Sequence, residues 1–241
     1  MEFKLWALLL LIADRDGFRK PRPGTRGYIL DAGANDGSSA VMLANAFRRL
    51  QLRVLAIEPL TSNVAVAQRR ARSVHNLDVL RAGLGDVNDS EGHYPSALDQ
   101  RRGNVNLQIA TFRPADNRGN STYPVMTIDA LFGEGSERTL VLAHLDLEGR
   151  EPEALRGANA TLWRDRPVLT VETYHIFMPD KHRAVMAHLD ALQYDVYTVQ
   201  ETVGGISDGR NRVAIPREDR YLRWIVNHYF DMPPERNKAH C

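Results

Sequence analysis

The stretch Tyr28-Ile-Leu-Asp-Ala-Gly-Ala-Asn-Asp-Gly37 decides the fold of this chain. It opens with a short apolar run that predicts a strand ending at Asp31. Residues 38–50 then have the apolar spacing of a helix. Between the two, Gly33 and Gly37 let the backbone bend sharply and approach a ligand closely. A strand, a glycine-containing loop and a helix in this order predict the first unit of a parallel sheet.

The same alternation continues along the chain, and Ser38 is placed to cap the first helix. Further apolar runs predict strands at 54–57, 77–80, 125–128, 140–143 and 168–171, and a closing pair at 196–199 and 212–215. Segments with helical spacing lie at 61–73, 151–163, 180–192 and after Pro216. This pattern predicts a doubly wound α/β fold with a mostly parallel sheet covered on both faces. A chain of 241 residues fits a single domain.

Acidic residues end four of the predicted strands: Asp31, Glu58, Asp146 and Glu172. In such sheets ligands bind beyond the carboxyl ends of the strands. Each residue taken alone could be a helix cap or a turn acid. Four acids at one edge of one sheet instead predict a ligand site there.

The first loop indicates which cofactor this edge binds. A dinucleotide-binding loop normally has three glycines in the pattern G-x-G-x-x-G, with helix N–H groups facing a pyrophosphate. This loop offers only Gly33 and Gly37, next to Asp31 and Asp36, whose carboxylates would repel a pyrophosphate. S-adenosylmethionine has no phosphate and carries ammonium and sulfonium charges, so acidic residues suit it. Glu58, about 20 residues further on, is placed to accept hydrogen bonds from the two ribose hydroxyls.

Several motifs together resemble the FkbM-type methyltransferases. They are Tyr28 to Gly37, Ala56-Ile-Glu-Pro59, Val125-Met-Thr-Ile-Asp129, Leu145-Asp-Leu-Glu-Gly-Arg-Glu151, Gly157-Ala158, Val171-Glu172 and Arg210-Asn-Arg-Val-Ala-Ile-Pro216. The Asp-x-Glu-Gly-x-Glu element with its Gly-Ala helix is the most specific, because general methyltransferases lack it. The resemblance covers about 28–216. It implies a class I, Rossmann-like methyltransferase fold and O-methylation of sugars, polyketides or other small metabolites.

The resemblance also implies roles for individual residues. Asp31, Gly33, Asn35 and Glu58 are expected to bind the cofactor, and Gly37, in the same loop, is expected to bind it as well. Gly85 and Asp86, after the third strand, are expected near the adenine. One position departs from the family: the residue before Leu145-Asp146 is commonly lysine, and here it is His144. This difference raises the prospect of a different substrate or of weakened activity.

Methyl transfer to a hydroxyl benefits from a base that takes its proton. The candidates at the carboxyl edge are Asp146, Glu172 and His175, with Glu148 as a further one. Histidine titrates near neutral pH, which suits a base, although His175 could equally be a surface residue. Glu148 and Glu151 could instead organise the turn into the next helix. We expect no metal, and a divalent ion held by Asp146 and Glu172 is the alternative.

The pattern divides the chain into three parts. Residues 1–26 form an apolar segment and a linker, 27–216 the methyltransferase domain, and 217–241 a C-terminal helix and tail. Within the domain, 87–124 is polar with one strand-like run at 105–109, and we expect a substrate arm or lid rather than a surface excursion. The run 5–13 is too short to span a bilayer. It is either a helix packed against the domain or a targeting segment. Residues 5–13 are the only part of the chain through which we expect membrane association to be possible.

Composition limits the partners and the compartment. The formal net charge is +1 and the arginines are scattered, which argues against a nucleic-acid partner. We expect a small-molecule or glycan acceptor. The single cysteine, Cys241, favours the cytoplasm, whereas three Asn-x-Ser/Thr triplets leave a secretory route open. Two other functions stay open: a non-catalytic S-adenosylmethionine-binding domain, and an NAD(P)-dependent oxidoreductase.

Overall fold

A computed structural model of the chain describes residues 20–93, 122–203, 206–230 and 234–235. Its main sheet has seven strands in the order β3-β2-β1-β7-β8-β10-β9. The strands are β1 (Arg26–Ala32), β2 (Arg53–Glu58), β3 (Leu77–Arg81), β7 (Arg138–Leu145), β8 (Val168–Glu172), β9 (Tyr194–Val203) and β10 (Ile206–Pro216). The first five are parallel, and β10 pairs antiparallel with both β8 and β9. This arrangement confirms the predicted doubly wound sheet and its closing pair.

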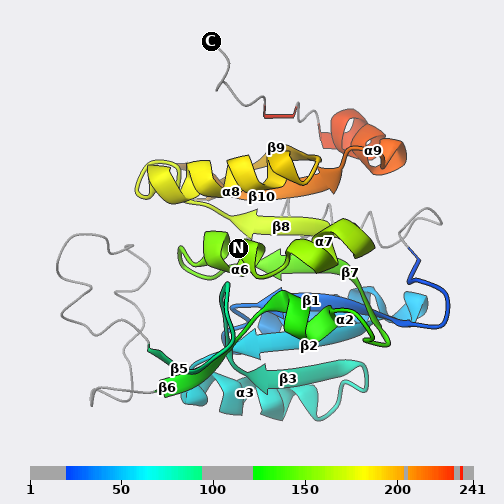
Figure 1. Ribbon diagram of the computed structural model, residues 1–241, viewed down its shortest axis with the longest axis vertical. Helices are drawn as coiled ribbons and strands as arrows, with labels where there is room; N and C mark the ends of the chain where they lie inside the picture. Colours follow the sequence, from blue (N-terminus) through cyan, green and yellow to red (C-terminus); the bar gives the residue numbers. More distant parts are fainter. Residues whose placement is uncertain (1–19, 94–121, 204–205, 231–233, 236–241) are drawn as a thin grey trace.

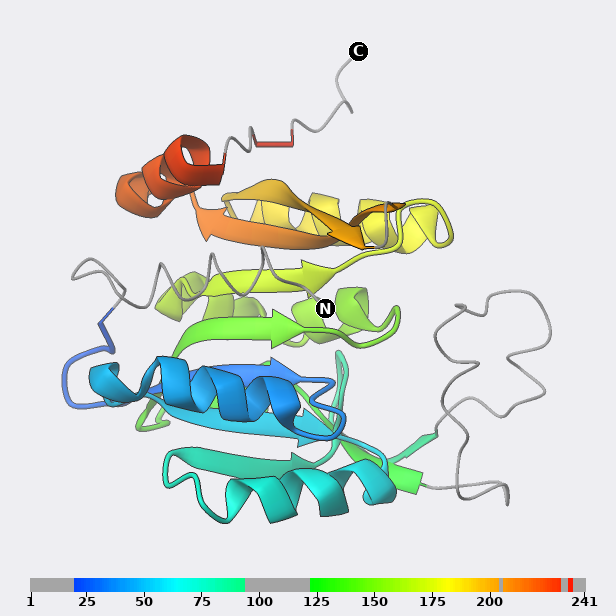
Figure 2. The same ribbon diagram turned by 180° about the vertical axis from the view of Figure 1, so that it is seen from behind.

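Helices cover both faces of the sheet (Figures 1 and 2). They are α2 (Ser38–Ala46), η1 (Arg48–Leu50), α3 (Thr61–Ala71), α5 (Ile128–Phe132), α6 (Glu151–Arg156), α7 (Asn159–Asp165), α8 (Pro179–Ala191) and α9 (Arg220–Phe230). One core cluster joins α2 and α9 to the sheet, and the other joins α5, α6, α7 and α8 to the opposite face. Because apolar side chains fill both faces of the sheet, the polar site residues lie at the carboxyl ends of its strands.

A second, three-stranded sheet was not predicted. It has the order β4-β6-β5, with β4 (Gly83–Leu84), β5 (Asp89–His93) and β6 (Thr122–Met126). The expected arm at 87–124 therefore begins and ends in paired strands. Most of it, including the expected strand at 105–109, lies outside the described residues, and so does the segment 5–13. Within the described ranges, no helix combines the length and apolarity needed to cross a membrane.

Four local predictions were wrong, and the first is the helix expected at 38–50, which is divided into α2 and η1. Ser38 does not cap α2, because Gly37 is the N-cap residue and the Asp36 carboxylate accepts the bond from Ser38 N. The strand expected at 125–128 ends at Met126, and Thr127 caps the short helix α5 by accepting from Ala130 N.

The helix expected at 151–163 is divided into α6 and α7 at Gly157. A Cβ atom at Gly157 would collide with the Gly85 carbonyl oxygen, so the chain passes the second sheet closely at this glycine. The Asp129 carboxylate then accepts bonds from Ala160 N and Thr161 N at the start of α7. The break thus fixes the second sheet and α5 against the α6–α7 segment.

Candidate cofactor and acceptor site

The loop after β1 is bent by residues with positive φ. Gly33, Asn35 and Gly37 have φ of 83°, 50° and 81°. A Cβ atom at Gly33 would collide with the Asp146 carbonyl oxygen, and one at Gly37 would lie 2.8 Å from the Ala67 Cβ. Glycine is therefore needed at both positions, for conformation and for space. The bend places the loop between the ends of β2 and β7.

Glu58, the last residue of β2, is joined to this loop. Its side chain is only 5% exposed. Oε2 accepts from Asn35 N at 3.0 Å, and Oε1 accepts from Leu60 N at 2.9 Å and from Asn63 Nδ2 at 3.3 Å. Burial raises the pKa of Glu58, and these donors partly offset the rise. The loop and β2 therefore hold one carboxylate in a fixed position, with oxygen lone pairs available for further donors.

Asp31 lies deeper than the sequence suggested. It is fully buried, and its Oδ1 lies 2.8 Å from His144 Nδ1, while Oδ2 accepts from Ser39 Oγ at 2.7 Å. Asp31 and His144 are direct neighbours on β1 and β7. The contacts of Asp31 thus hold the start of the loop to β7 and to α2, and His144 is the residue of β7 that pairs with it.

Three carboxylates gather at the ends of β7 and β8. Oxygens of Asp146, Glu148 and Glu172 lie within 4.8 Å of one another. Glu172 is buried, Asp146 is half-buried and Glu148 is exposed, with a φ of 52°. Asp146 follows β7 directly, and its N–H donates to the Ala32 carbonyl at 3.0 Å. The structure thus brings together two predicted site residues and the further candidate, Glu148. Such a group can accept protons from a hydroxyl or provide ligands for a hard cation.

Two residues for which no role was predicted hold Glu172. Arg210 Nη1 donates to Glu172 Oε1 at 2.8 Å, and the Tyr174 hydroxyl donates to Oε2 at 2.5 Å. The hydroxyl also lies 3.3 Å from Glu148 Oε2. Burial and then the charge of Glu172 raise the pKa of Tyr174. Tyr174 therefore remains a hydrogen-bond donor, and Glu172 has partners on both oxygens.

Glu151 organises the turn that carries Glu148. Its Oε1 accepts from Leu147 N at 2.8 Å and from Gly149 N at 3.2 Å. Burial raises the pKa of Glu151 to about 7 despite these donors. The turn-organising role expected for Glu151 is thus present.

His175 lies on the exposed turn after β8. Its ring centre is 6.0 Å from that of His182, at an angle of 61°. His182 Nδ1 lies 3.1 Å from Thr173 Oγ1, and burial lowers the pKa of His182 to about 4. His175 therefore lies at the same carboxyl ends of the strands as the three carboxylates. The ring that the structure places beside it is that of His182.

Gly85 and Asp86 follow β4 at the second sheet. Gly85 N donates to the Met126 carbonyl at 3.1 Å. Asp86 Oδ2 accepts from Arg156 Nε at 3.2 Å, and both of these side chains are largely exposed. The structure places Gly85 against Gly157, so this segment is joined to α6.

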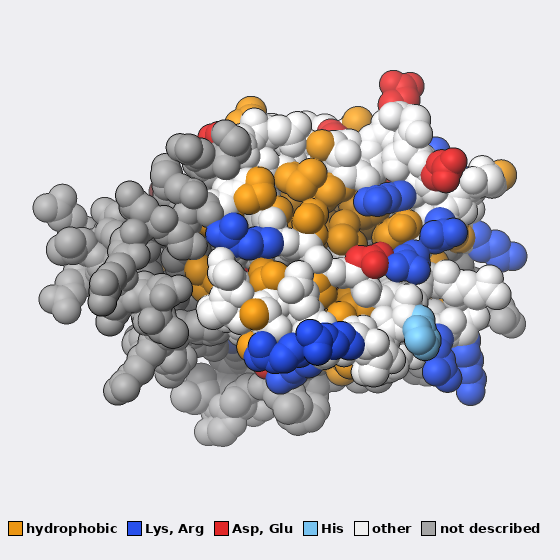
Figure 3. Space-filling model, turned by 90° about the horizontal axis from the view of Figure 1, so that it is seen from below, with side chains coloured by type: hydrophobic (Ala, Val, Ile, Leu, Met, Phe, Trp, Pro, Cys, Tyr) orange, Lys and Arg blue, Asp and Glu red, His pale blue; other side chains and the backbone are white. Residues whose placement is uncertain are grey.

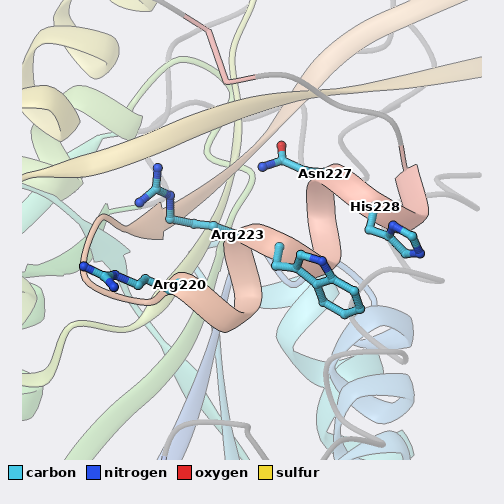
Figure 4. A pocket seen from close by; sticks show the side chains of 5 residues that line it. Arg220, Arg223, Asn227 and His228 are labelled. Carbon is cyan, nitrogen blue, oxygen red and sulfur yellow. The ribbon is translucent and has the colours of Figure 1, made fainter.

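Other surface features lie away from this edge. A hollow of about 450 Å³ is lined by five residues of α9, at the end of the molecule opposite to the β8–α8 turn (Figures 1 and 4). The end formed by β3 and α3 shows groups of basic side chains (Figure 3). Exposed arginines there include Arg69 and Arg70, and Arg70 pairs with Asp36 at 2.9 Å. Figure 3 shows hydrophobic side chains between these basic groups, so this end is a mixed surface and not a uniformly charged one.

Comparisons with known proteins identify the family and the fold. The family described as "Methyltransferase FkbM domain" matches residues 31–196. Among solved structures, the fold is similar to that of methyltransferase FkbM from Methylobacillus flagellatus KT, with 18% identity and a TM-score of 0.52. The match covers 86% of this chain and 47% of that one, so the chain spans about half of that protein.

A second solved structure is the O-methyltransferase from Bacillus cereus in complex with SAH. Its identity is 14% and its TM-score 0.47, with 89% of this chain and 81% of that one covered. None of the curated proteins gives a significant match to the chain.

Proposed function

The chain belongs to the FkbM methyltransferase family, and from this premise we propose that it transfers a methyl group from S-adenosylmethionine to a hydroxyl of a small metabolite or glycan. The cofactor supplies a methyl carbon that its sulfonium charge already activates. The protein therefore has to bind the cofactor, orient the acceptor and accept a proton. The observation that carries the proposal is the carboxylate of Glu58, fixed at the bend after β1.

The residues of the loop fit a nucleoside without phosphate. Glu58 is held by Asn35 and Leu60 N–H groups and can accept further bonds from the ribose hydroxyls. The loop carries Asp36 and lacks the third glycine of a dinucleotide-binding loop, which disfavours the oxidoreductase alternative. Gly33 and Gly37 bend the loop closely against Asp146 and Ala67, and their backbone is proposed to border the cofactor. Asp31, paired with His144, supports this loop, and Gly85 and Asp86 are proposed to border the adenine.

Asp146 is the base that we propose. Glu172 has Arg210 and Tyr174 on its two oxygens, so it is better suited to orient groups at the rim. Asp146 is half-buried at the end of β7 and shares the rim with Glu172. A well-placed base contributes on the order of 10²–10⁴-fold to the rate. His175, on the adjoining turn, is the alternative base.

The test is incubation with isotopically labelled S-adenosylmethionine and an extract of small metabolites and glycans, followed by mass spectrometry. We expect a product that is heavier by one labelled methyl group, formed by the wild type and not by Asp146→Asn. A His175→Ala variant without activity, beside an active Asp146→Asn variant, would reverse the choice of base.

Two further outcomes bear on the alternatives. Binding of S-adenosylhomocysteine without transfer to any extract would favour a non-catalytic binding domain. Activity that EDTA abolishes and Mg²⁺ restores would show that Asp146, Glu148 and Glu172 hold a metal during transfer, against our expectation.

A further inference from the structure

The turn between β8 and α8 exposes two large apolar side chains at the carboxyl edge of the sheet. Ile176 is 71% and Phe177 67% exposed, the highest values among the large hydrophobic residues that the structure describes. In Figure 1 this turn lies at the end toward which the parallel strands point. Adjacent apolar side chains left in water at a ligand-binding edge often mark a contact surface.

The turn has a fixed conformation. Thr173 N donates to the Arg210 carbonyl at 2.8 Å, and Met178 N donates to the Tyr174 carbonyl at 2.7 Å. His182 Nδ1 lies 3.1 Å from Thr173 Oγ1. The backbone on both sides of Ile176 and Phe177 is thus held, so the two side chains form a defined surface.

This surface is continuous with the three carboxylates. The Tyr174 hydroxyl, from the same turn, contacts both Glu172 and Glu148. Lys181, in the first turn of α8, donates to the Gly149 carbonyl, which joins the start of α8 to the turn after β7. One rim therefore carries an apolar part and an acidic part side by side.

We propose that Ile176 and Phe177 contact an apolar portion of the methyl acceptor, while its hydroxyl lies against Asp146. The inference rests on the function proposed above and narrows its substrate class. The acceptor is an uncharged or cationic hydroxyl compound with an apolar body. We expect phosphorylated and carboxylated sugars to bind poorly, because three carboxylates lie within 4.8 Å of one another and Arg210 offsets the charge of one of them, Glu172.

The charges around the turn favour an acceptor over a lipid surface. Protein surfaces that bind anionic membranes carry lysine and arginine beside their apolar residues. Here the basic side chains at the start of α8 are engaged with the protein, because Arg183 pairs with Asp180 and Lys181 donates to the Gly149 carbonyl, and Glu148 adds negative charge.

The test measures binding apart from turnover. The probes are octyl β-D-glucoside below its micellar concentration, glucose and glucose 6-phosphate, each titrated into protein saturated with S-adenosylhomocysteine. The variants are the double substitution Ile176→Ser/Phe177→Ser and the control Leu50→Ser, an exposed leucine of η1. All altered residues are exposed, so we expect unchanged melting temperatures.

We expect the wild type to bind octyl β-D-glucoside most tightly and glucose 6-phosphate least. The double variant should bind the octyl probe on the order of tenfold more weakly, because a buried Phe or Ile contributes at least that factor. Leu50→Ser should match the wild type. Equal binding of octyl β-D-glucoside and glucose, or an unaffected double variant, would overturn the inference.

Two parallel measurements separate other causes. Sedimentation with phosphatidylcholine–phosphatidylglycerol vesicles that only the double variant loses would assign the turn to a membrane and overturn the proposal. Failure of the wild type to bind S-adenosylhomocysteine would refute the proposed function itself. Binding of S-adenosylhomocysteine without preference for the octyl probe would refute this inference alone.

Discussion

Replacing Gly33 by alanine should destabilise the protein much more than replacing Gly24 by alanine. Both glycines have positive φ, 83° and 77°, so the conformational cost of a Cβ atom is nearly the same. The space around them differs. A Cβ at Gly24 has nothing within 4 Å, whereas one at Gly33 would collide with the Asp146 carbonyl oxygen and lie 2.8 Å from its carbon.

The difference sets the expected magnitudes. An alanine in the left-handed region costs about 1–2 kcal/mol, which is the whole effect expected for Gly24→Ala. For Gly33→Ala the backbone of β1 and the residue after β7 must also separate. We therefore expect a loss above about 4 kcal/mol, in the range that severe strain produces. For a chain of this size, each kcal/mol lowers the melting temperature by about 2–4 °C.

The assay is urea unfolding followed by circular dichroism, with both variants beside the wild type. Equal denaturation midpoints for the two variants would refute the close approach of the β1–α2 loop to Asp146. S-adenosylhomocysteine binding adds a second measure: Gly24→Ala should bind normally, and the folded fraction of Gly33→Ala should bind weakly.

Three further predictions concern buried acids. Glu58→Gln should weaken the binding of S-adenosylhomocysteine about 10–100-fold, because a charge-assisted hydrogen bond contributes about 1.5–3 kcal/mol. Calorimetry measures the Kd, and an unchanged Kd would exclude Glu58 from the site. The pKa of Glu151 is raised from 4.5 to about 7, so its contribution to stability is complete below pH 4.5 and is lost as the pH rises through about 7. Denaturant unfolding of Glu151→Gln should therefore depend less on pH than that of the wild type over this range, and an identical slope would contradict the assignment. Asp31→Ala removes the carboxylate that pairs with the buried His144. The free energy of unfolding in urea should therefore fall by about 2–4 kcal/mol, and S-adenosylhomocysteine should no longer raise the melting temperature. A variant as stable and as responsive as the wild type would contradict the role of this pair.

The ends of three site-bearing strands could be predicted from the sequence, because their apolar runs stop at an acidic residue. Glu58 and Glu172 are the last residues of β2 and β8, and Asp146 directly follows β7. The burial of Asp31 could not be predicted in the same way. It depends on which strand lies beside β1, and the pairing of Asp31 with His144 spans 113 residues of sequence.

The partners of Glu172 were missed for a related reason. Arg210 reaches Glu172 because β10 returns antiparallel to β8, in a register that places Asn211 opposite Glu172. The sequence predicted this closing pair of strands but contained no signal for their register. Tyr174 carried no motif at all, and its role follows from the turn that directs its hydroxyl back to Glu172.

The break between α6 and α7 also depends on tertiary contact. Residues 151–163 have continuous helical spacing, and local preference alone favours one helix. The close contact of Gly157 with Gly85 requires the second sheet, which the polar composition of 87–124 concealed. Tertiary packing thus overrode a correct local pattern.

The identity of the bound nucleoside tests the account most directly. Isothermal titration calorimetry of the wild-type protein should be done with S-adenosylhomocysteine and, separately, with NAD⁺. Because Glu58 can accept the ribose hydroxyls, while the loop after β1 carries Asp36 and lacks the third glycine of a dinucleotide-binding loop, we predict saturable binding of S-adenosylhomocysteine and none of NAD⁺. Binding of NAD⁺ without binding of S-adenosylhomocysteine would contradict the account.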